Sequence, residues 1–187
     1  GEIMGLILCV ILCGLSCTNL ITAPSISLEG KNLWIAQSIP VPAATVLRAK
    51  VKLQMLLCIP ITALSALLMG IVLKLELLTL VLAVLVPAAF NLFTALLGVV
   101  VNLHFPTFDY INETVVIKQS MSTMICMFGS MAVVLVLALL YALLLSASVA
   151  PTLFLAVCLV LLVIVCVLMW RYLGHGGSAR FAALQAD

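Results

Sequence analysis

Three cysteines near the start of the chain have a spacing that could support metal binding or redox chemistry. Cys9, Cys13 and Cys17 recur every four residues, so a helix would place all three thiols on one face. No His or carboxylate lies beside them, and thiolates are costly in an apolar environment. The pattern therefore favours packing of small apolar side chains. The same interpretation applies to the other cysteines, which also lie in apolar runs: Cys58, Cys126, Cys158 and Cys166.

The sequence lacks the common catalytic and nucleotide-binding motifs. It contains no H-E-x-x-H, no G-x-S-x-G, no Walker sequence and no paired carboxylates at helical spacing inside an apolar stretch. We expect His104 and His175 to be interfacial groups rather than ligands or bases. The sequence thus predicts no catalytic residue, no cofactor site and no metal site, so ATP hydrolysis would require a partner subunit.

Uncharged polar residues, in contrast, do occur within the long apolar stretches. The simplest role for them is hydrogen bonding between helices, worth about 0.6 kcal/mol for each pair. An alternative concerns Asn91 and Thr94, which lie one turn apart just after Pro87 and could line a translocation path. The absence of charge in these stretches argues against proton-relay pumps and charge-coupled carriers. The polar residues concerned are Gln54, Thr62, Ser65, Asn91, Thr94, Asn102, Ser130 and Tyr141.

Composition identifies the environment that these elements occupy. The chain has 187 residues, of which 66% are hydrophobic and 7% charged, and its mean hydropathy is +1.44. Soluble domains are typically about 45–50% apolar and about 25% charged. The sequence therefore predicts an all-α integral membrane protein surrounded by the lipid bilayer, formed as one transmembrane domain over residues 1–187. A net charge of +2 is too small for a nucleic-acid-binding surface.

The apolar stretches are long enough to cross a bilayer, which takes roughly 20 helical residues. We predict a bundle of about five transmembrane helices. Pro60 and Pro87 lie inside two of the stretches, where they predict kinks or local breaks. The predicted spans cover residues 4–22, 53–73, 77–103, 121–147 and 151–173.

The basic residues indicate how the bundle is oriented. With five spans, Lys74 falls on one side of the membrane and the other seven Lys and Arg residues fall on the opposite side. Basic residues accumulate in cytoplasmic loops, so residues 23–52, residues 104–120 and the C-terminus should be cytoplasmic. The Asn112-Glu-Thr sequon would then be unused. The seven are Lys31, Arg48, Lys50, Lys52, Lys118, Arg171 and Arg180.

The first large loop has the pattern of a short amphipathic helix. Over residues 25–39, Leu28, Ile35 and Ile39 fall on one narrow helical face, and Trp34 suits a membrane interface. Pro40 and Pro42 would end this helix and begin the next. We predict that the helix lies on the cytoplasmic membrane surface.

Strings in both large loops resemble those of a known transporter family. They are Ser27-Leu-Glu-Gly-Lys-Asn-Leu-Trp-Ile, Ser38-Ile-Pro, Asn102-Leu-His-Phe-Pro, Asp109-Tyr-Ile-Asn-Glu and Lys118-Gln-Ser. Together they resemble the C-terminal half of bacterial permease subunits of the "putative ABC exporter" family, over most of residues 20–125. Tyr110 stands where a Trp is expected. Since the chain begins inside an apolar stretch without a signal peptide, we expect the natural gene to encode further spans upstream.

The resemblance implies a permease in a bacterial plasma membrane that exports an unidentified substrate with a cytoplasmic ABC ATPase as its partner. It also implies that short cytoplasmic helices dock on the ATPase, and residues 25–39 and 105–120 are the candidates by position. Two alternatives stay open: these loops are plain connections, or the chain is a non-transporting membrane anchor or regulatory module. The candidate partner-coupling residues are Glu29, Lys31, Trp34, Asp109, Glu113 and Lys118.

Overall fold

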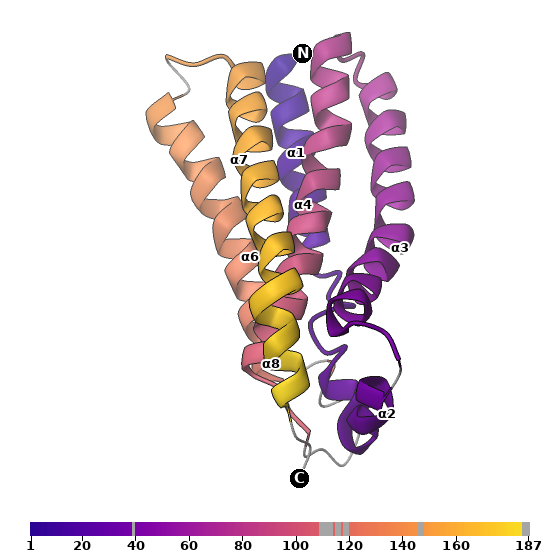
Figure 1. Cartoon of the computed structure of the whole chain (residues 1–187). Helices are drawn as coiled ribbons and strands as arrows, with labels where there is room; N and C mark the ends of the chain where they lie inside the picture. The colour runs from indigo at the N-terminus through magenta and orange to yellow at the C-terminus, as the bar shows by residue number, and fades with distance from the viewer. Residues whose placement is uncertain (39, 109–113, 115–116, 118–119, 146–147, 185–187) are drawn as a thin grey trace.

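The computed structural model describes residues 1–38, 40–108, 114, 117, 120–145 and 148–184. These residues form helices and connecting turns, without a β-strand among them. The prediction of an all-α membrane bundle is confirmed (Figure 1). The helices are α1 (Glu2–Ser16), α2 (Leu33–Ser38), α3 (Ala43–Val72), α4 (Leu77–His104), α6 (Met121–Leu140), α7 (Pro151–Tyr172) and α8 (Ser178–Ala183), with a 3-10 helix at Ser27–Asn32 and π-helical turns at Tyr141–Leu145 and Leu173–Gly177.

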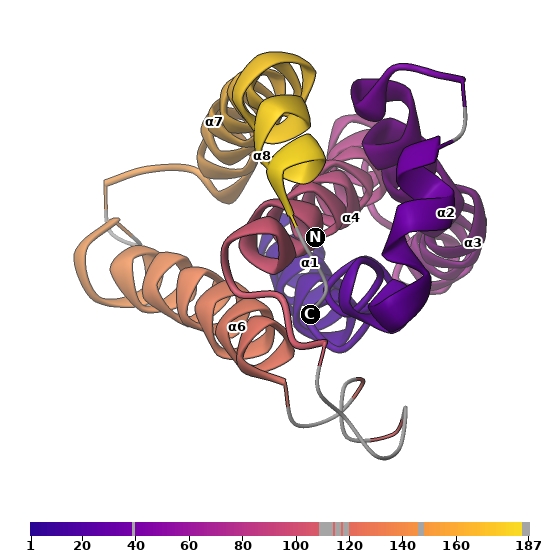
Figure 2. The same ribbon diagram turned by 60° about the horizontal axis from the view of Figure 1, so that its bottom comes forward.

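Helix α4 is the centre of the bundle, because it packs against α1, α3, α6 and α7 (Figures 1 and 2). Within its most apolar window 50% of the residues are buried, against 22% in each of the other three long helices. Apolar side chains on the outer helices instead face outward, among them Leu56, Leu143 and Leu168. An apolar outer surface around a buried central helix is the arrangement that a bilayer stabilises.

Four helices are long and apolar enough to cross a membrane, and α1 is a shorter apolar helix. α1 ends at Ser16, six residues before the predicted end of the first span. α4 and α7 match their predicted spans within one residue. α3 begins at Ala43, ten residues before its predicted span, so its first turns extend beyond the apolar stretch.

The predicted kinks at proline do not interrupt the helices. Pro60 lies inside α3 and Pro87 inside α4, and both helices continue through the proline. Pro87 is buried in the core, whereas Pro60 is exposed on the outer surface. The stretch over residues 77–103 is thus one helix without a break at Pro87.

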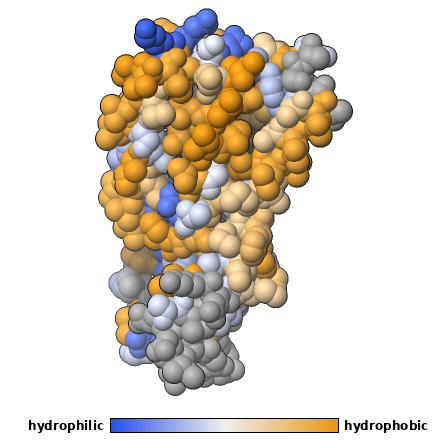
Figure 3. All heavy atoms as spheres, turned by 180° about the vertical axis from the view of Figure 1, so that it is seen from behind, coloured by the Kyte–Doolittle hydropathy of each residue, from blue (hydrophilic) through white to orange (hydrophobic). Residues whose placement is uncertain are grey.

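The two ends of the bundle differ in chemistry. The start of α1, the α3–α4 turn and the start of α7 lie at one end, where Lys74 is found (Figure 1). The start of α3, the ends of α4 and α7, and α8 lie at the other end, with Arg48, Lys50, Lys52, Arg171 and Arg180. Figure 3 shows hydrophobic side chains over most of one face between these ends. The described basic residues therefore divide as the sequence predicted.

The chain between α1 and α3 is folded differently from the predicted amphipathic helix. Gly30 has φ 48° and ψ −129°, a non-helical conformation that puts a kink inside the 3-10 helix Ser27–Asn32, just before α2. Ile26 and Leu33 are buried, while Ile35 is 47% exposed and Leu28 is half-buried. The predicted single helix is thus interrupted at Gly30, and the placement of Leu28 and Ile35 on a membrane surface stays a prediction; Ile39 lies outside the described residues. We refer to residues 17–38 as the inner segment.

Candidate functional site

The inner segment runs along the second half of α4 and is fixed there by buried polar side chains. The segment carries backbone groups that no regular helix satisfies, although Cys17, Ala23 and Ile26 are fully buried. Non-helical backbone at membrane depth is tolerated only where other protein groups satisfy it. The side chains that do so come from α3 and α4, and they form the candidate site.

Gln54 of α3 makes the first of these attachments. Its side chain is fully buried, and its Oε1 accepts hydrogen bonds from the Thr22 backbone N–H at 3.0 Å. Its Nε2 donates to the Asn19 carbonyl at 3.0 Å and approaches Thr94 Oγ1 at 3.4 Å. Thr22 Oγ1 lies 2.9 Å from Gln54 Oε1 and 2.8 Å from the Ala95 carbonyl. One amide therefore joins the inner segment to α3, and the Thr22 hydroxyl adds a contact to α4.

Gly98 lets the backbone of the inner segment approach α4. A Cβ atom at this position would lie 2.8 Å from the Ala23 backbone nitrogen and would overlap the Thr22 side chain. Real side chains do not tolerate such a contact with backbone, so only glycine fits here without displacement of the segment.

Asn102 of α4 makes the second attachment, about 10 Å further along the helix than Ala95 at 1.5 Å per residue. Its Oδ1 accepts from the backbone N–H groups of Ile26 at 2.8 Å and Ser27 at 3.1 Å. Its Nδ2 donates to Ser27 Oγ at 2.7 Å and to Ser122 Oγ at 3.0 Å. The N-cap residue of the 3-10 helix is Ile26, whose apolar side chain cannot accept a hydrogen bond. Asn102, from the neighbouring helix α4, supplies the capping hydrogen bonds instead.

Glu29 and Lys50 form an ion pair between the inner segment and α3. The Lys50 Nζ lies 2.5 Å from Glu29 Oε1 and donates to the Ser25 carbonyl at 3.0 Å. The Lys50 and Glu29 side chains are 16% and 23% exposed. The Glu29 carboxylate is therefore engaged within the molecule, and its predicted role in coupling to a partner stays a prediction.

The structure describes two of the other predicted coupling residues, Trp34 and Lys31. Trp34 on α2 is 65% exposed, as a docking or interfacial side chain requires. Lys31 belongs to the 3-10 helix. Asp109, Glu113 and Lys118 lie outside the described residues, so their predicted role stays a prediction.

Helix α8 covers the same end of the bundle. Arg180 Nε donates to the Leu103 carbonyl at the end of α4 at 3.0 Å. Gln37 Nε2 donates to the carbonyls of Phe181 at 2.9 Å and Leu184 at 3.0 Å, which ties α2 to the end of α8. Phe181 is almost fully buried. The inner segment, α8 and the ends of α3 and α4 therefore form one connected layer.

Asn91 and Thr94 lie in the contact between α3 and α4. Asn91 is 0% and Thr94 2% exposed. Asn91 Nδ2 donates to the Pro87 carbonyl at 3.1 Å and to Thr62 Oγ1 at 3.3 Å, while its Oδ1 is buried without a partner among the described residues. Thr94 Oγ1 donates to the Asn91 carbonyl at 3.0 Å. Both residues are closed off in this structure, and their role in a translocation path stays a prediction.

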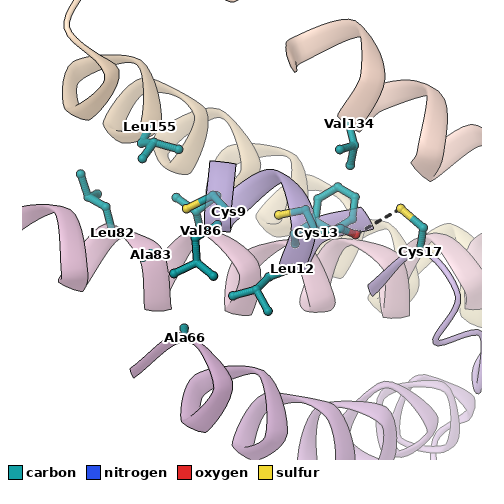
Figure 4. Close-up of a cluster of buried hydrophobic side chains, with 12 residues drawn as sticks. Cys9, Leu12, Cys13, Cys17, Ala66, Leu82, Ala83, Val86, Val134 and Leu155 are labelled. Carbon is teal, nitrogen blue, oxygen red and sulfur yellow. Dashed lines mark hydrogen bonds between the residues drawn. The ribbon is translucent and has the colours of Figure 1, made fainter. Parts of the chain in front are cut away.

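The three cysteines with helical spacing pack in the core of the bundle. Cys9, Cys13 and Cys17 are 2%, 6% and 0% exposed, among side chains that include Leu12, Val86 and Val134 (Figure 4). Cys17 Sγ donates to the Cys13 carbonyl at 3.3 Å. Over the described residues, no three His, Cys, Asp or Glu side chains come together as metal ligands would. The structure agrees with packing as the role of these thiols.

The sequence indicated some of these residues but not their partners. Gln54 and Asn102 were recognisable as polar residues in apolar stretches, and both do bond between elements. Nothing in the sequence pointed to Thr22 or Gly98, since a Thr or Gly in an apolar stretch is common. No protein-family model, no curated protein and no solved structure matches the chain.

Proposed function

We propose that this chain is a permease subunit of an ATP-binding-cassette exporter in a bacterial plasma membrane, with its C-terminus in the cytoplasm. A separate cytoplasmic ATPase subunit would supply the energy, and the exported substrate is unidentified. The observation that supports this proposal best is the attachment of the inner segment to α3 and α4 through Gln54, Asn102 and the Glu29–Lys50 pair. The resemblance of the loop strings to exporter permeases supports it as well.

Such attachments suit a mechanical link. α2 carries exposed Trp34 and Ile35 at the surface of the layer, where a partner can contact them. A displacement of α2 passes along the chain to the 3-10 helix, and from there to α3 through Glu29 and to α4 through Asn102. Because the hydrogen bonds of the Gln54 and Asn102 side-chain amides are buried, breaking them costs more free energy than moving α3 and α4 together with the inner segment. The layer would thus transmit partner motion to membrane-spanning helices.

A second candidate function is a membrane anchor or regulatory module that transports nothing. The observation that favours it is the burial of Asn91 and Thr94, which line no open path in this structure. An anchor needs a partner-binding surface but no path across the membrane. The two functions differ in whether partner activity depends on the link between the layer and the helices.

A charge-swap series at Glu29 and Lys50 tests the link. Glu29→Lys and Lys50→Glu each replace the attraction by repulsion, and the double variant restores an ion pair with reversed polarity. The tagged protein is purified from its native membranes, and two quantities are measured: retention of an ABC ATPase, and the stimulation of its ATP hydrolysis by the membrane subunit relative to the ATPase alone. We expect each single variant to lower the stimulation by roughly two- to fivefold, corresponding to about 0.5–1 kcal/mol, and the double variant to recover it.

A matched control is Lys74→Glu at the opposite end of the bundle, which should change neither quantity. Retention of the ATPase with unchanged stimulation in all variants would favour the anchor. Failure of any ABC ATPase to co-purify with the unmodified protein would refute the exporter proposal.

A further inference from the structure

A cavity of about 530 Å³ opens on the outer surface between α3, α4 and α7, at the basic end of the bundle. Most of its lining is apolar and includes Met55, Leu92 and Val163. One end is different: Lys52 of α3 and Arg171 of α7 lie there with Trp170, and both basic residues are exposed. The volume falls within the range of about 300–1,000 Å³ that is usual for ligand sites.

Arg48 adds a third positive charge beside this end of the cavity. It lies one turn before Lys52 on α3, and its guanidinium stacks over the Trp170 ring at 5.1 Å from the centroid. In the described part of the chain, the ion pair is that between Glu29 and Lys50, so no described carboxylate neutralises Arg48, Lys52 or Arg171. Clustered cations at the edge of an apolar groove attract a ligand that is anionic at one end and apolar along the rest.

The dimensions fit one membrane leaflet. From Arg171 to Val163 the α7 helix rises about 12 Å at 1.5 Å per residue, and half the hydrocarbon core of a bilayer is about 15 Å thick. Trp170 and Tyr172 mark the level of the membrane interface on α7, where aromatic residues accumulate. The basic residues therefore sit at headgroup level and the apolar lining at acyl-chain level.

We propose that this cavity binds one anionic phospholipid, with its phosphate at Lys52, Arg171 and Arg48 and an acyl chain along Met55, Leu92 and Val163. An anionic phospholipid fits because its headgroup carries a net negative charge to match Lys52, Arg171 and Arg48, whereas the phosphate of a zwitterionic lipid is balanced by the cation of its own headgroup. The lipid would fill the space between α3 and α7, which both contact α4 here. This site does not depend on the exporter function proposed above.

Trp170 provides a direct readout, since it lines the cavity and the sequence contains only two tryptophans. The chain carrying Trp34→Phe is reconstituted in two series of phosphatidylcholine vesicles. A fixed fraction of the lipid is replaced by brominated phosphatidylglycerol in one series and by brominated phosphatidylcholine in the other. The quenching of Trp170 fluorescence is then compared between the two series. We expect the anionic lipid to occupy the site about fivefold more than its mole fraction predicts.

The double variant Lys52→Gln/Arg171→Gln should abolish this preference, while Lys74→Gln, at the other end of the bundle, should retain it. In the Trp34→Phe parent itself, raising NaCl from about 50 to about 500 mM should weaken the preference, which gives a test that needs no further folded variant. Equal quenching by the two brominated lipids, or a preference that survives both the double substitution and high salt, would overturn the proposal.

Discussion

Gln54 illustrates how a polar residue in an apolar stretch can be structural rather than catalytic. Its amide satisfies the Thr22 N–H and the Asn19 carbonyl, two backbone groups that have left the helical pattern after Ser16. In a bilayer these groups have no water as an alternative partner. A single side chain thereby allows the chain to turn inside the bundle. Its loss would leave the Thr22 N–H and the Asn19 carbonyl buried without this hydrogen-bond partner.

Replacing Gln54 by Leu keeps the approximate volume of the side chain and removes both bonds. We expect a loss of about 1–3 kcal/mol in unfolding free energy, because buried backbone groups are left unpaired. The measurement is thermal unfolding followed with a thiol-reactive dye, since all seven cysteines are buried in the folded protein. At about 2–4 °C per kcal/mol the shift is easily resolved.

Ser65→Ala is the matched control on the same helix. Ser65 is half-buried, and its side chain bonds within α3 to the Ile61 carbonyl, so its loss should change the unfolding free energy by less than about 0.5 kcal/mol. Equal midpoints for Gln54→Leu and Ser65→Ala would contradict the role assigned to Gln54.

At the residue scale, the sequence identified which side chains are unusual but not what they bond. Gln54 and Asn102 stand out because polar residues are rare in such stretches. Their partners Thr22, Asn19 and Ile26 are far from them in the sequence, and no local sequence pattern encodes that pairing. The pairing of Glu29 with Lys50 was not predictable for the same reason, since it depends on the fold.

At the scale of elements, the inner segment is the feature that departs most from the predicted bundle. Its path along α4 depends on close approach at Gly98, where a Cβ would meet the Ala23 nitrogen at 2.8 Å. The neighbouring structure cannot yield easily, because Thr22 is held by both Gln54 and the Ala95 carbonyl.

Gly98→Ala should therefore destabilise the protein although alanine favours helix formation. We expect a loss of about 1–3 kcal/mol from overpacking, measured as a lower unfolding midpoint in the same thiol assay. The paired control is Gly129→Ala in α6, where a Cβ would meet nothing within 4 Å. That variant should be neutral or slightly stabilised, by up to about 1 kcal/mol. A Gly98→Ala protein as stable as Gly129→Ala would show that the segment is not closely packed on α4.

Hydrophobic length predicted the elements well where a helix crosses the whole bundle. α4 and α7 follow their apolar stretches, because a helix satisfies most of its backbone groups internally. The end of α1 could not be predicted this way. Polar and apolar residues alternate irregularly after Ser16, and the backbone that leaves the helix there bonds instead to side chains of α3 and α4.

At the scale of the whole molecule, the bundle is asymmetric along its axis. The described basic residues other than Lys74 gather at the end formed by the inner segment and α8. Basic residues are retained on the cytoplasmic side of a membrane, so we expect this end to face the cytoplasm. The proposed partner surface on α2 and the proposed lipid site lie at this same end, and both assignments depend on the orientation.

Cysteine labelling in intact cells tests this central claim most directly. The native thiols should stay unreactive because they are buried, so single cysteines are added at exposed positions: Glu76 and Ser148 at one end, and Trp34 and His175 at the other. With a membrane-impermeant maleimide, we predict labelling at positions 76 and 148 in intact cells, and labelling at positions 34 and 175 only after the membrane is permeabilised. Labelling of position 34 or 175 in intact cells, with 76 and 148 protected, would contradict the orientation and with it the cytoplasmic assignment of the layer.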